Sequence, residues 1–379
     1  MTAALKAPFP YMGGKSRIAR EVWRRFGDTP NLVEPFFGSG AILLGRPPFE
    51  GNRIETVNDL DGHISNFWRA LQADPDAVAY HAAWPVSELD LHARGDWLYY
   101  RPDARAWAER LRSDPDYYDA KSAGWWVWFA SCWIGGLPAI PATVNGTTVY
   151  GPGGGPAGVY ERLPHLGDAG RGVARKRPHL GNAGMGVARQ RPHLGSGGQG
   201  NGVHGLNGVP RQMPVPNIDD ANGGPRRAML IAYFRQLAAR LERVRVCCGD
   251  WTRVLGPSVT FKHGLTAVFL DPPYSHAERD SQLYSHESDT VAAAVREWAI
   301  ANGDNPQLRI ALCGYDTEHG AAMPDTWHAH AWKANGGYGS QGNGRGRANA
   351  GREVVWFSPA CINPIDTLPL FAAQKENNQ

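Results

Sequence analysis

A glycine-rich stretch in the middle of the chain limits where a folded core can form. Residues 151–227 hold 20 of the 46 glycines in the 379-residue sequence. Within them the tetrapeptide Pro-His-Leu-Gly occurs three times at a spacing of fourteen residues, starting at Pro164, Pro178 and Pro192. Each copy offers little beyond one leucine and one valine, which is too little apolar surface to stack as a solenoid. We therefore expect a mobile insert here and a core built from the residues on either side.

The charge of this insert differs from that of the whole chain. It carries ten Lys and Arg residues against four acidic residues, whereas the whole chain has a net charge of only +3. A flexible basic arm containing Arg175, Lys176 and Arg177 would neutralise phosphates, and a duplicated linker whose charge keeps it soluble is the equal alternative. No Cys or acidic residue recurs with the three repeated histidines, so we expect no metal site.

The chain as a whole has the composition of a soluble globular protein, with 42% hydrophobic and 20% charged residues. The longest apolar run, Trp125–Ala130, is far below the roughly 20 residues of a membrane-spanning helix, and Met1–Lys15 has no signal-peptide core. These features predict a cytoplasmic protein with no membrane contact. The five cysteines lack zinc-site or disulfide-framework spacing, and we expect them to be reduced and buried.

Strand and helix patterns alternate outside the insert, which predicts an α/β fold. A helix is expected where Leu230, Phe234, Leu237, Leu241 and Val244 follow a 3.6-residue period. The segment 76–150 reads as mostly helical and holds seven of the fourteen tryptophans, which we expect to form a core rather than a base-stacking platform. The expected strands are residues 31–35, 53–58, 266–270, 308–313, 327–332 and 353–357, and the expected helix runs into an apolar segment at 244–248.

Two glycine-containing segments near the N-terminus have the character of ligand-binding turns. In the segment Tyr11-Met12-Gly13-Gly14-Lys15, a glycine pair and an ammonium can meet a carboxylate or phosphate, although the P-loop pattern is not met. The strand at residues 31–35 runs into Glu34-Pro35-Phe36-Phe37-Gly38-Ser39-Gly40, the pattern of a nucleotide-cradling turn. Asp59 follows the next strand, where an acid accepts hydrogen bonds from ribose hydroxyls. We therefore expect a Rossmann-like sheet with a nucleotide-type ligand.

The segment Asp271-Pro272-Pro273-Tyr274 follows the buried strand 266–270 and carries the chemistry. The Asp271 carboxylate and the Pro272 carbonyl offer two acceptors in a rigid frame, and Tyr274 adds a flat ring. This set fits a planar amine such as the amino group of a nucleobase, because accepting both its hydrogens frees the nitrogen lone pair. The alternative is a simple strand-terminating turn.

Taken in order, these motifs resemble the Dam-like group of N6-adenine-specific DNA methyltransferases over residues 8–75 and about 228–275. The resemblance implies an S-adenosylmethionine cofactor and DNA as partner, with the catalytic segment at residues 271–274 and Asp271 also near the cofactor. It also implies cofactor-binding roles for Tyr11, Gly13, Gly14, Lys15, Glu34, Phe36, Gly38, Gly40, Asp59 and Asp250. The tryptophan-rich stretch ending at residue 136 resembles phage-encoded members. The repeat-bearing insert has no counterpart in the group.

The resemblance also implies a division of the chain. Residues 1–75 and 228–379 would form the catalytic domain, 76–150 the target-recognition region and 151–227 the insert. The glycine-rich segment 336–352 holds Arg345, Arg347 and Arg352 without an acidic residue, and we expect it to contact DNA phosphates.

Several alternatives stay open from sequence alone. The same pocket could hold the amino group of cytosine, an RNA base or a protein amide, and a non-catalytic nucleic-acid-binding protein with a relic core is the rival from another class. The sequence leaves open whether the chain is a monomer or a homodimer, which DNA sequence it targets, and whether a restriction nuclease accompanies it.

Overall fold

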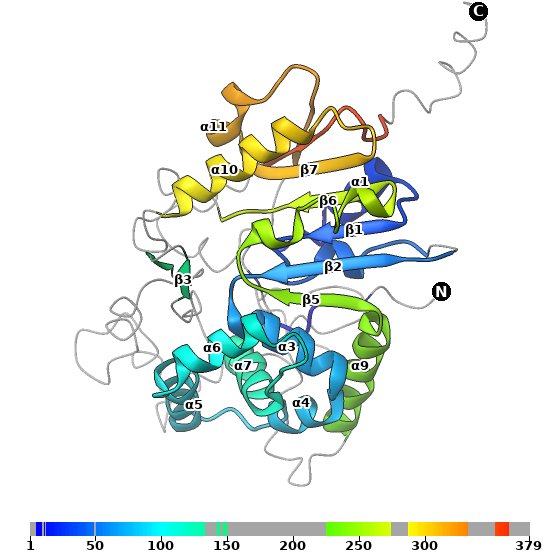
Figure 1. The fold of residues 1–379 in the computed structure, drawn as a ribbon. Helices are drawn as coiled ribbons and strands as arrows, with labels where there is room; N and C mark the ends of the chain where they lie inside the picture. Colours follow the sequence, from blue (N-terminus) through cyan, green and yellow to red (C-terminus); the bar gives the residue numbers. More distant parts are fainter. Residues whose placement is uncertain are drawn as a thin grey trace, which may run out of the picture.

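Seven strands form one sheet in the order β5-β2-β1-β6-β7-β9-β8 (Figure 1). The computed structural model describes residues 5–9, 11, 13–48, 51–132, 142–144, 147–149, 225–273, 287–332 and 353–363. The strands are β1 (Asn31–Glu34), β2 (Ile54–Asp59), β5 (Val244–Cys248), β6 (Thr266–Leu270), β7 (Leu308–Tyr315), β8 (His328–Trp332) and β9 (Glu353–Phe357). All neighbouring pairs are parallel except the two that involve β9. This arrangement confirms the predicted α/β, Rossmann-like fold.

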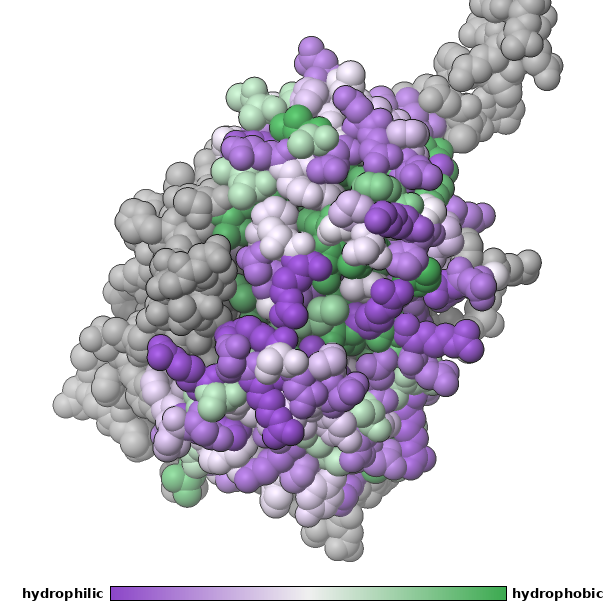
Figure 2. Space-filling view, viewed as in Figure 1, coloured by the Kyte–Doolittle hydropathy of each residue, from purple (hydrophilic) through white to green (hydrophobic). Residues whose placement is uncertain are grey.

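The central strands are apolar because both faces of the sheet are covered. Every residue of β1, β6 and β9 is buried. Parallel strands buried on both faces read as near-continuous apolar runs, which is why the sequence located them closely. The surface has the opposite character to these buried strands. Polar residues cover most of the described surface on this face, and hydrophobic residues appear only in scattered patches (Figure 2).

Most of the helices lie near the two ends of the sheet. Helices α3 to α7 and α9 gather beyond the edge strand β5, whereas α10 and α11 lie near β7 at the other end (Figure 1). The helices are α1 (Ala19–Phe26), α2 (Ala41–Leu44), α3 (Gly62–Ala73), α4 (Pro75–Ala82), α5 (Glu88–Tyr100), α6 (Ala104–Ser113), α7 (Ala120–Cys132), α9 (Pro225–Leu241), α10 (Glu287–Asn302) and α11 (Asp316–His319). A large core joins α3, α4, α7 and α9 to the sheet.

The tryptophans of α7 confirm the prediction of a core. Trp126 and Trp128 are 1% and 0% exposed, and Trp126 packs against Phe9 and Phe67. Trp125 is half-buried on the outer side of the helix, where its ring lies 5.0 Å from that of Trp97. The described part of this segment is therefore a packed helical lobe with a few tryptophan rings at its surface.

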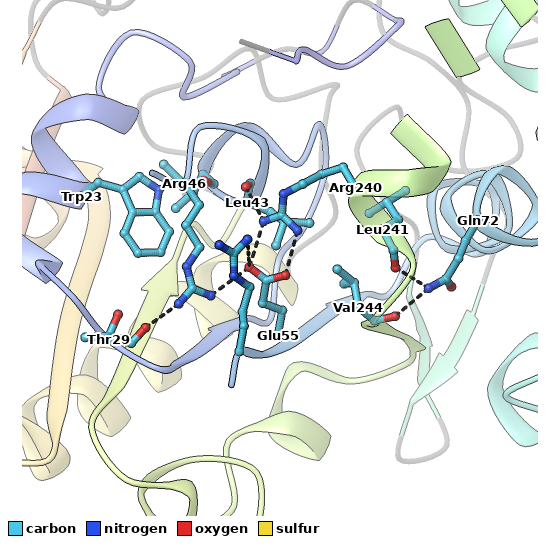
Figure 3. A network of polar contacts seen from close by, with 11 residues as sticks. Trp23, Thr29, Leu43, Arg46, Glu55, Gln72, Arg240, Leu241 and Val244 are labelled. Carbon is cyan, nitrogen blue, oxygen red and sulfur yellow. Dashed lines mark hydrogen bonds and ion pairs between the residues drawn. The ribbon is translucent and has the colours of Figure 1, made fainter. Parts of the chain in front are cut away.

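A buried ionic network joins the two halves of the chain (Figure 3). Glu55 of β2 accepts two hydrogen bonds of 2.8 Å from Arg240 of α9 and one of 2.8 Å from Arg46. Arg240 also donates to the Leu43 carbonyl at 2.9 Å, and Gln72 of α3 donates to the Val244 carbonyl at 3.0 Å. Because α9 follows the glycine-rich insert directly, this network confirms that the core forms from the residues flanking it.

Some sequence predictions need correction or fall outside the described residues. The described part of the 76–150 segment is mostly helical, as predicted, but it also contains a short hairpin of β3 (Ala142–Val144) and β4 (Thr147–Val149) that was not expected. All five cysteines are free, but Cys132 and Cys247 are only half-buried. The insert at residues 151–227 lies outside the described residues except for the start of α9.

Candidate active site

The order of the sheet brings the two main motifs together. The strand order reverses between β1 and β6, which are parallel neighbours with Val33 opposite Val268. In open α/β sheets ligands bind outside the carboxyl ends of the strands at such a switch point. The turn at residues 35–40 leaves β1 there, and Asp271 leaves β6 beside it, although more than 200 residues separate them in the sequence.

The turn after β1 depends on its two glycines. Gly38 and Gly40 have φ angles of +47° and +63°, in the left-handed region that favours glycine. A Cβ on Gly38 would lie 2.6 Å from the ring of Tyr11, so this ring rests directly on the turn. Gly13, with a φ of +77°, gives the N-terminal segment its own left-handed position. Tyr11 therefore contacts Gly38, and an added Cβ on Gly14 would lie 3.9 Å from Ser39 Oγ, so the N-terminal segment lies against the turn.

Asp59 braces this turn. Its carboxylate accepts hydrogen bonds of 2.9 Å from the backbone amides of Gly38 and Asp61. Burial raises the pKa of the Asp59 carboxyl to about 6, although these amides lower it in part. Burial and then the charge of Asp59 raise the pKa of Asp61 to about 7. The carboxylate thus joins the ends of β1 and β2, at the place where a bound ribose is expected.

Asn58 ties a third loop to the other two. Its side-chain amide donates to the carbonyls of Pro35 at 3.0 Å and Gly249 at 2.9 Å. Asp250, which follows Gly249, caps the short helix at Trp251–Val254 by accepting a hydrogen bond of 3.0 Å from the Thr252 backbone amide. The Trp251 ring lies 6.3 Å from that of Phe36 at an interplanar angle of 27°. Trp251 was not assigned a role from sequence, and its place beside Asp250 and Phe36 gives this part of the site a flat apolar wall.

Asp271 forms an ion pair with Lys15. The Lys15 Nζ lies 2.9 Å from Asp271 Oδ2 and donates to the Gly13 carbonyl at 2.7 Å. The Lys15 side chain is 4% exposed and that of Asp271 is 19% exposed. Burial lowers the pKa of Lys15, but the charges of Asp271 and Glu353 outweigh it and hold that pKa above its ordinary value. Lys15 therefore stays charged, and its ammonium faces the catalytic segment.

Glu353 at the start of β9 is a further acid near Lys15. Its Oε2 lies 3.9 Å from Lys15 Nζ. Cys313 of β7 faces the same group, and burial raises the pKa of its thiol, with the charge of Asp271 adding to the effect. The sequence assigned neither residue, because both lie within apolar strands.

Glu34 occupies a different environment from the other motif residues. The residue is only 1% exposed, and burial raises the pKa of its carboxyl to about 8. A hydrogen bond from the Leu43 backbone opposes this shift in part. Glu34 is therefore enclosed by the protein in this structure, next to α2 and not at the surface of the site.

The remaining predicted residues divide into two groups. Gly14, Pro272 and Pro273 lie in the described segments at the site, with Pro272 buried. Tyr274, Arg175, Lys176, Arg177, Arg345, Arg347 and Arg352 lie outside the described residues. Within the described part of the chain, no cluster of three or more His, Cys, Asp or Glu residues suits a metal ion. None of the described helices combines the length and apolarity needed to span a membrane.

The left-handed glycine at the turn gives a direct test of the site. We expect Gly38→Ala to weaken binding of a nucleotide-type ligand by about tenfold, because the new methyl group displaces the Tyr11 ring and strains the backbone. The matched control is Gly264→Ala, where φ is +89° but nothing lies within 4 Å of an added Cβ. Calorimetric titration of both variants checks this. Equal affinity in the two variants would exclude a ligand-binding role for the turn.

Comparisons with known proteins agree with the motifs. Residues 11–122 match the family model for D12 class N6 adenine-specific DNA methyltransferase. The chain is 27% identical over 70 residues to the DNA N-6-adenine-methyltransferase of Escherichia phage P1, covering 18% of this chain and 9% of that protein. It is 30% identical over 84 residues to the DNA adenine methylase of Vibrio cholerae serotype O1, covering 22% of this chain and 29% of that protein.

These matches confirm the resemblance to N6-adenine-specific DNA methyltransferases over the N-terminal part of the chain. The matched segments span less than a third of the length of either relative. The family-model match includes the glycine segments, Lys15 and Asp59, whereas Asp271 and Glu353 lie beyond it.

Proposed function

We propose that this chain is a DNA methyltransferase that transfers a methyl group from S-adenosylmethionine to the N6 amino group of adenine. The observation that carries the proposal is the placement of Asp271, paired with Lys15 at 2.9 Å, beside the glycine turn of β1. Asp271, which would accept hydrogen bonds from the reacting amine, thus lies with the proposed cofactor turn at the switch point of one sheet.

The residues at this edge fit the proposed cofactor. An added Cβ on Gly38 would clash with Tyr11, so glycine here lets the Tyr11 ring lie on the turn that is proposed to hold the cofactor. Asp59 supplies a carboxylate for ribose hydroxyls, and Phe36 with Trp251 supplies flat surfaces for an adenine ring. Gly13, Gly14, Gly40, Tyr11 and Asp250 complete the proposed set, with Lys15 and Asp271 at its inner end. When bound, the cofactor supplies a sulfonium methyl group.

The proposed contribution of the protein to catalysis is to accept hydrogen bonds from the reacting amino group. The amino group of adenine is a weak nucleophile because its lone pair is delocalised into the ring. The Asp271 carboxylate and the Pro272 carbonyl would accept its two hydrogens, and Tyr274 would stack on the base. Direct attack on the methyl group needs no nucleophile from the protein, so positioning dominates. The base must first leave the DNA stack, which costs a few kcal/mol.

Residues 1–75 and 228–379 form the proposed catalytic domain, and the helical lobe within residues 76–150 forms the proposed target-recognition region. The start of α7 is tied to α3, the helix that follows β2, because the backbone of Asp119 donates to the Asn66 side-chain oxygen at 2.7 Å and accepts from its side-chain nitrogen at 2.9 Å. Lys121 there lies 4.7 and 4.4 Å from the Trp97 and Trp125 ring centroids. An exposed cation on tryptophan rings suits a phosphate contact. The insert and the arginines of segment 336–352 are proposed to add further contacts.

We expect Lys121→Ala to weaken DNA binding by about three- to tenfold and to reduce the salt slope by about one. The matched control is Lys262→Ala. Lys262 is also exposed, but it precedes β6 and so lies at the amino end of that strand, away from the carboxyl ends that form the proposed site. Titration of fluorescent DNA at several salt concentrations checks this. Equal effects of the two substitutions would contradict a DNA-facing role for the lobe.

The pKa of Asp59 predicts how cofactor affinity depends on pH. The carboxylate accepts ribose hydroxyls best when ionised, and its pKa is raised to about 6. Affinity is therefore expected to stay constant above pH 7 and to fall by about tenfold at pH 5. Calorimetry from pH 5 to 8 measures this, and Asp59→Asn should bind more weakly but with little dependence on pH.

The effect of pH on folding stability distinguishes the expected loss of cofactor affinity from a loss of folded protein. A carboxyl whose pKa is raised in the folded state binds its proton more tightly there than in the unfolded chain. Its contribution to folding stability therefore increases as the pH falls through about 6 towards the ordinary value of 3.8. A loss of affinity with a concurrent loss of folded protein would count against the ribose role.

The decisive test of the proposed function is product analysis. DNA is incubated with the protein and with S-adenosylmethionine labelled in its methyl group, and it is then digested to nucleosides. We expect the label in N6-methyl-2′-deoxyadenosine. Label in a methylated cytosine nucleoside would make cytosine the acceptor, and label incorporated only when RNA or protein replaces DNA in the reaction would make an RNA base or a protein amide the acceptor. No label and no cofactor binding would support a non-catalytic nucleic-acid-binding protein.

A further inference from the structure

Three ionisable side chains from distant parts of the sequence meet at the carboxyl ends of β6 and β7. Lys15 comes from the segment before α1, Asp271 follows β6, and Glu353 is the first residue of β9. Lys15 Nζ lies 2.9 Å from the Asp271 carboxylate and 3.9 Å from that of Glu353. The Lys15 and Glu353 side chains are 4% and 6% exposed. One buried ammonium thus lies between two carboxylates.

The backbone fixes Glu353 at this place. In the sheet, Glu353 is opposite Tyr315 of β7 on one side and Trp332 of β8 on the other. The Trp332 ring lies 5.9 Å from Lys15 Nζ, so β8 also contributes to the wall around the ammonium. A residue held by two ladders has little freedom to move, whereas the lysine side chain has four rotatable bonds. The backbone of Glu353 is therefore fixed on both sides, and its carboxylate lies 3.9 Å from the more flexible Lys15 ammonium.

The charges explain what this arrangement does for Asp271. An ammonium has three hydrogens to donate, and Lys15 directs one to the Gly13 carbonyl and one to Asp271 Oδ2. The attraction of Glu353 acts from the β9 side and opposes movement of the ammonium away from this position. Asp271 follows the last strand residue, Leu270, and is therefore held by its side-chain partner as well as by its backbone.

We propose that Glu353 is a positioning residue for methyl transfer, which holds the Lys15 ammonium against Asp271 and so keeps that carboxylate in one orientation at the end of β6. The proposal rests on the proposed function, because it assigns Asp271 the reacting amine. It gives the C-terminal strand, beyond the part of the chain that matches the family model, a share in the active site.

The test is a set of single-turnover measurements with saturating DNA and S-adenosylmethionine. We expect Glu353→Gln to lower the transfer rate by about tenfold or more, with cofactor and DNA affinities within about twofold of wild type. Glu353→Asp keeps the charge and should recover most of the rate. In a Lys15→Met background, Glu353→Gln should have less than about a twofold further effect, since a residue acting through Lys15 loses its influence when Lys15 is gone.

The matched control is Glu21→Gln. Glu21 is also an ion-paired and largely buried acid, contacting Arg24 and Arg25 on α1, but it lies outside the site. Its substitution should leave the transfer rate unchanged.

The possible outcomes separate the two proposals. An inactive wild-type protein overturns both. An active wild type with an unaffected Glu353→Gln variant overturns the positioning role alone. Equal losses from Glu353→Gln in the wild-type and Lys15→Met backgrounds, or loss of native circular dichroism in both Glu353→Gln and Glu353→Asp, would assign Glu353 a structural role and also overturn the proposal.

Discussion

Replacing Asp271 with Ala is expected to lower methyl transfer to adenine by about 10²- to 10⁴-fold while changing the cofactor dissociation constant by no more than about twofold. The carboxylate is the acceptor that frees the lone pair of the amine, and no other described carboxylate occupies the end of β6. The fold should survive, because Lys15 keeps the Gly13 carbonyl and Glu353 as partners after Asp271 is removed.

Single-turnover transfer and calorimetric cofactor titration measure the two effects separately. The control is Asp316→Ala, since Asp316 is an exposed acid directly after the neighbouring parallel strand β7. It should retain wild-type transfer. Full residual turnover by Asp271→Ala would reject the assignment of the catalytic segment.

The second large effect is expected for Lys15→Met. Removing the ammonium leaves Asp271 and Glu353 as two carboxylates without their shared cation in a buried site. Loss of one partner of a buried ion pair costs about 3 to 5 kcal/mol of folding stability, and the partial exposure of Asp271 favours the lower end. Cofactor affinity should also fall, because the turn at Gly13 loses the hydrogen bond from Lys15.

Denaturant unfolding and cofactor titration provide the measurements. The double variant Lys15→Met, Asp271→Asn should regain part of the stability, since only one carboxylate then faces the missing ammonium. An unfolding free energy equal to that of wild type would show that the ion pair is weak, and an unchanged cofactor dissociation constant would count against a cofactor role for Lys15.

The strands were predictable because burial on both faces leaves a clear apolar signal. The expected strands 266–270 and 353–357 coincide with β6 and β9, and the apolar segment 244–248 after the expected helix forms β5. Asp59 and Asp271 were predictable for a related reason, since each comes at the carboxyl end of a strand where ligands of parallel sheets bind. The hairpin at β3 and β4 was missed although Asn145-Gly146, a common two-residue hairpin turn, separates its strands.

Glu353 could not be found from a motif. It lies more than 80 residues beyond Asp271 and starts a strand that is antiparallel to its neighbours, so no local pattern connects it with Lys15. The available signal was a single acid at the head of the apolar run 354–357, which also fits an exposed strand end. Only the register of β9 between β7 and β8 shows that this acid is buried at the site.

The position of β9 also has a consequence for biosynthesis. β9 emerges from the ribosome after β8, yet it lies between β7 and β8 in the sheet. A nascent chain that ends before residue 353 therefore cannot attach β8 through the pairing seen here, and it lacks the second acid beside Lys15. The part of the sheet that is synthesised last therefore carries this acid, so the proposed site is complete only after β9 has paired.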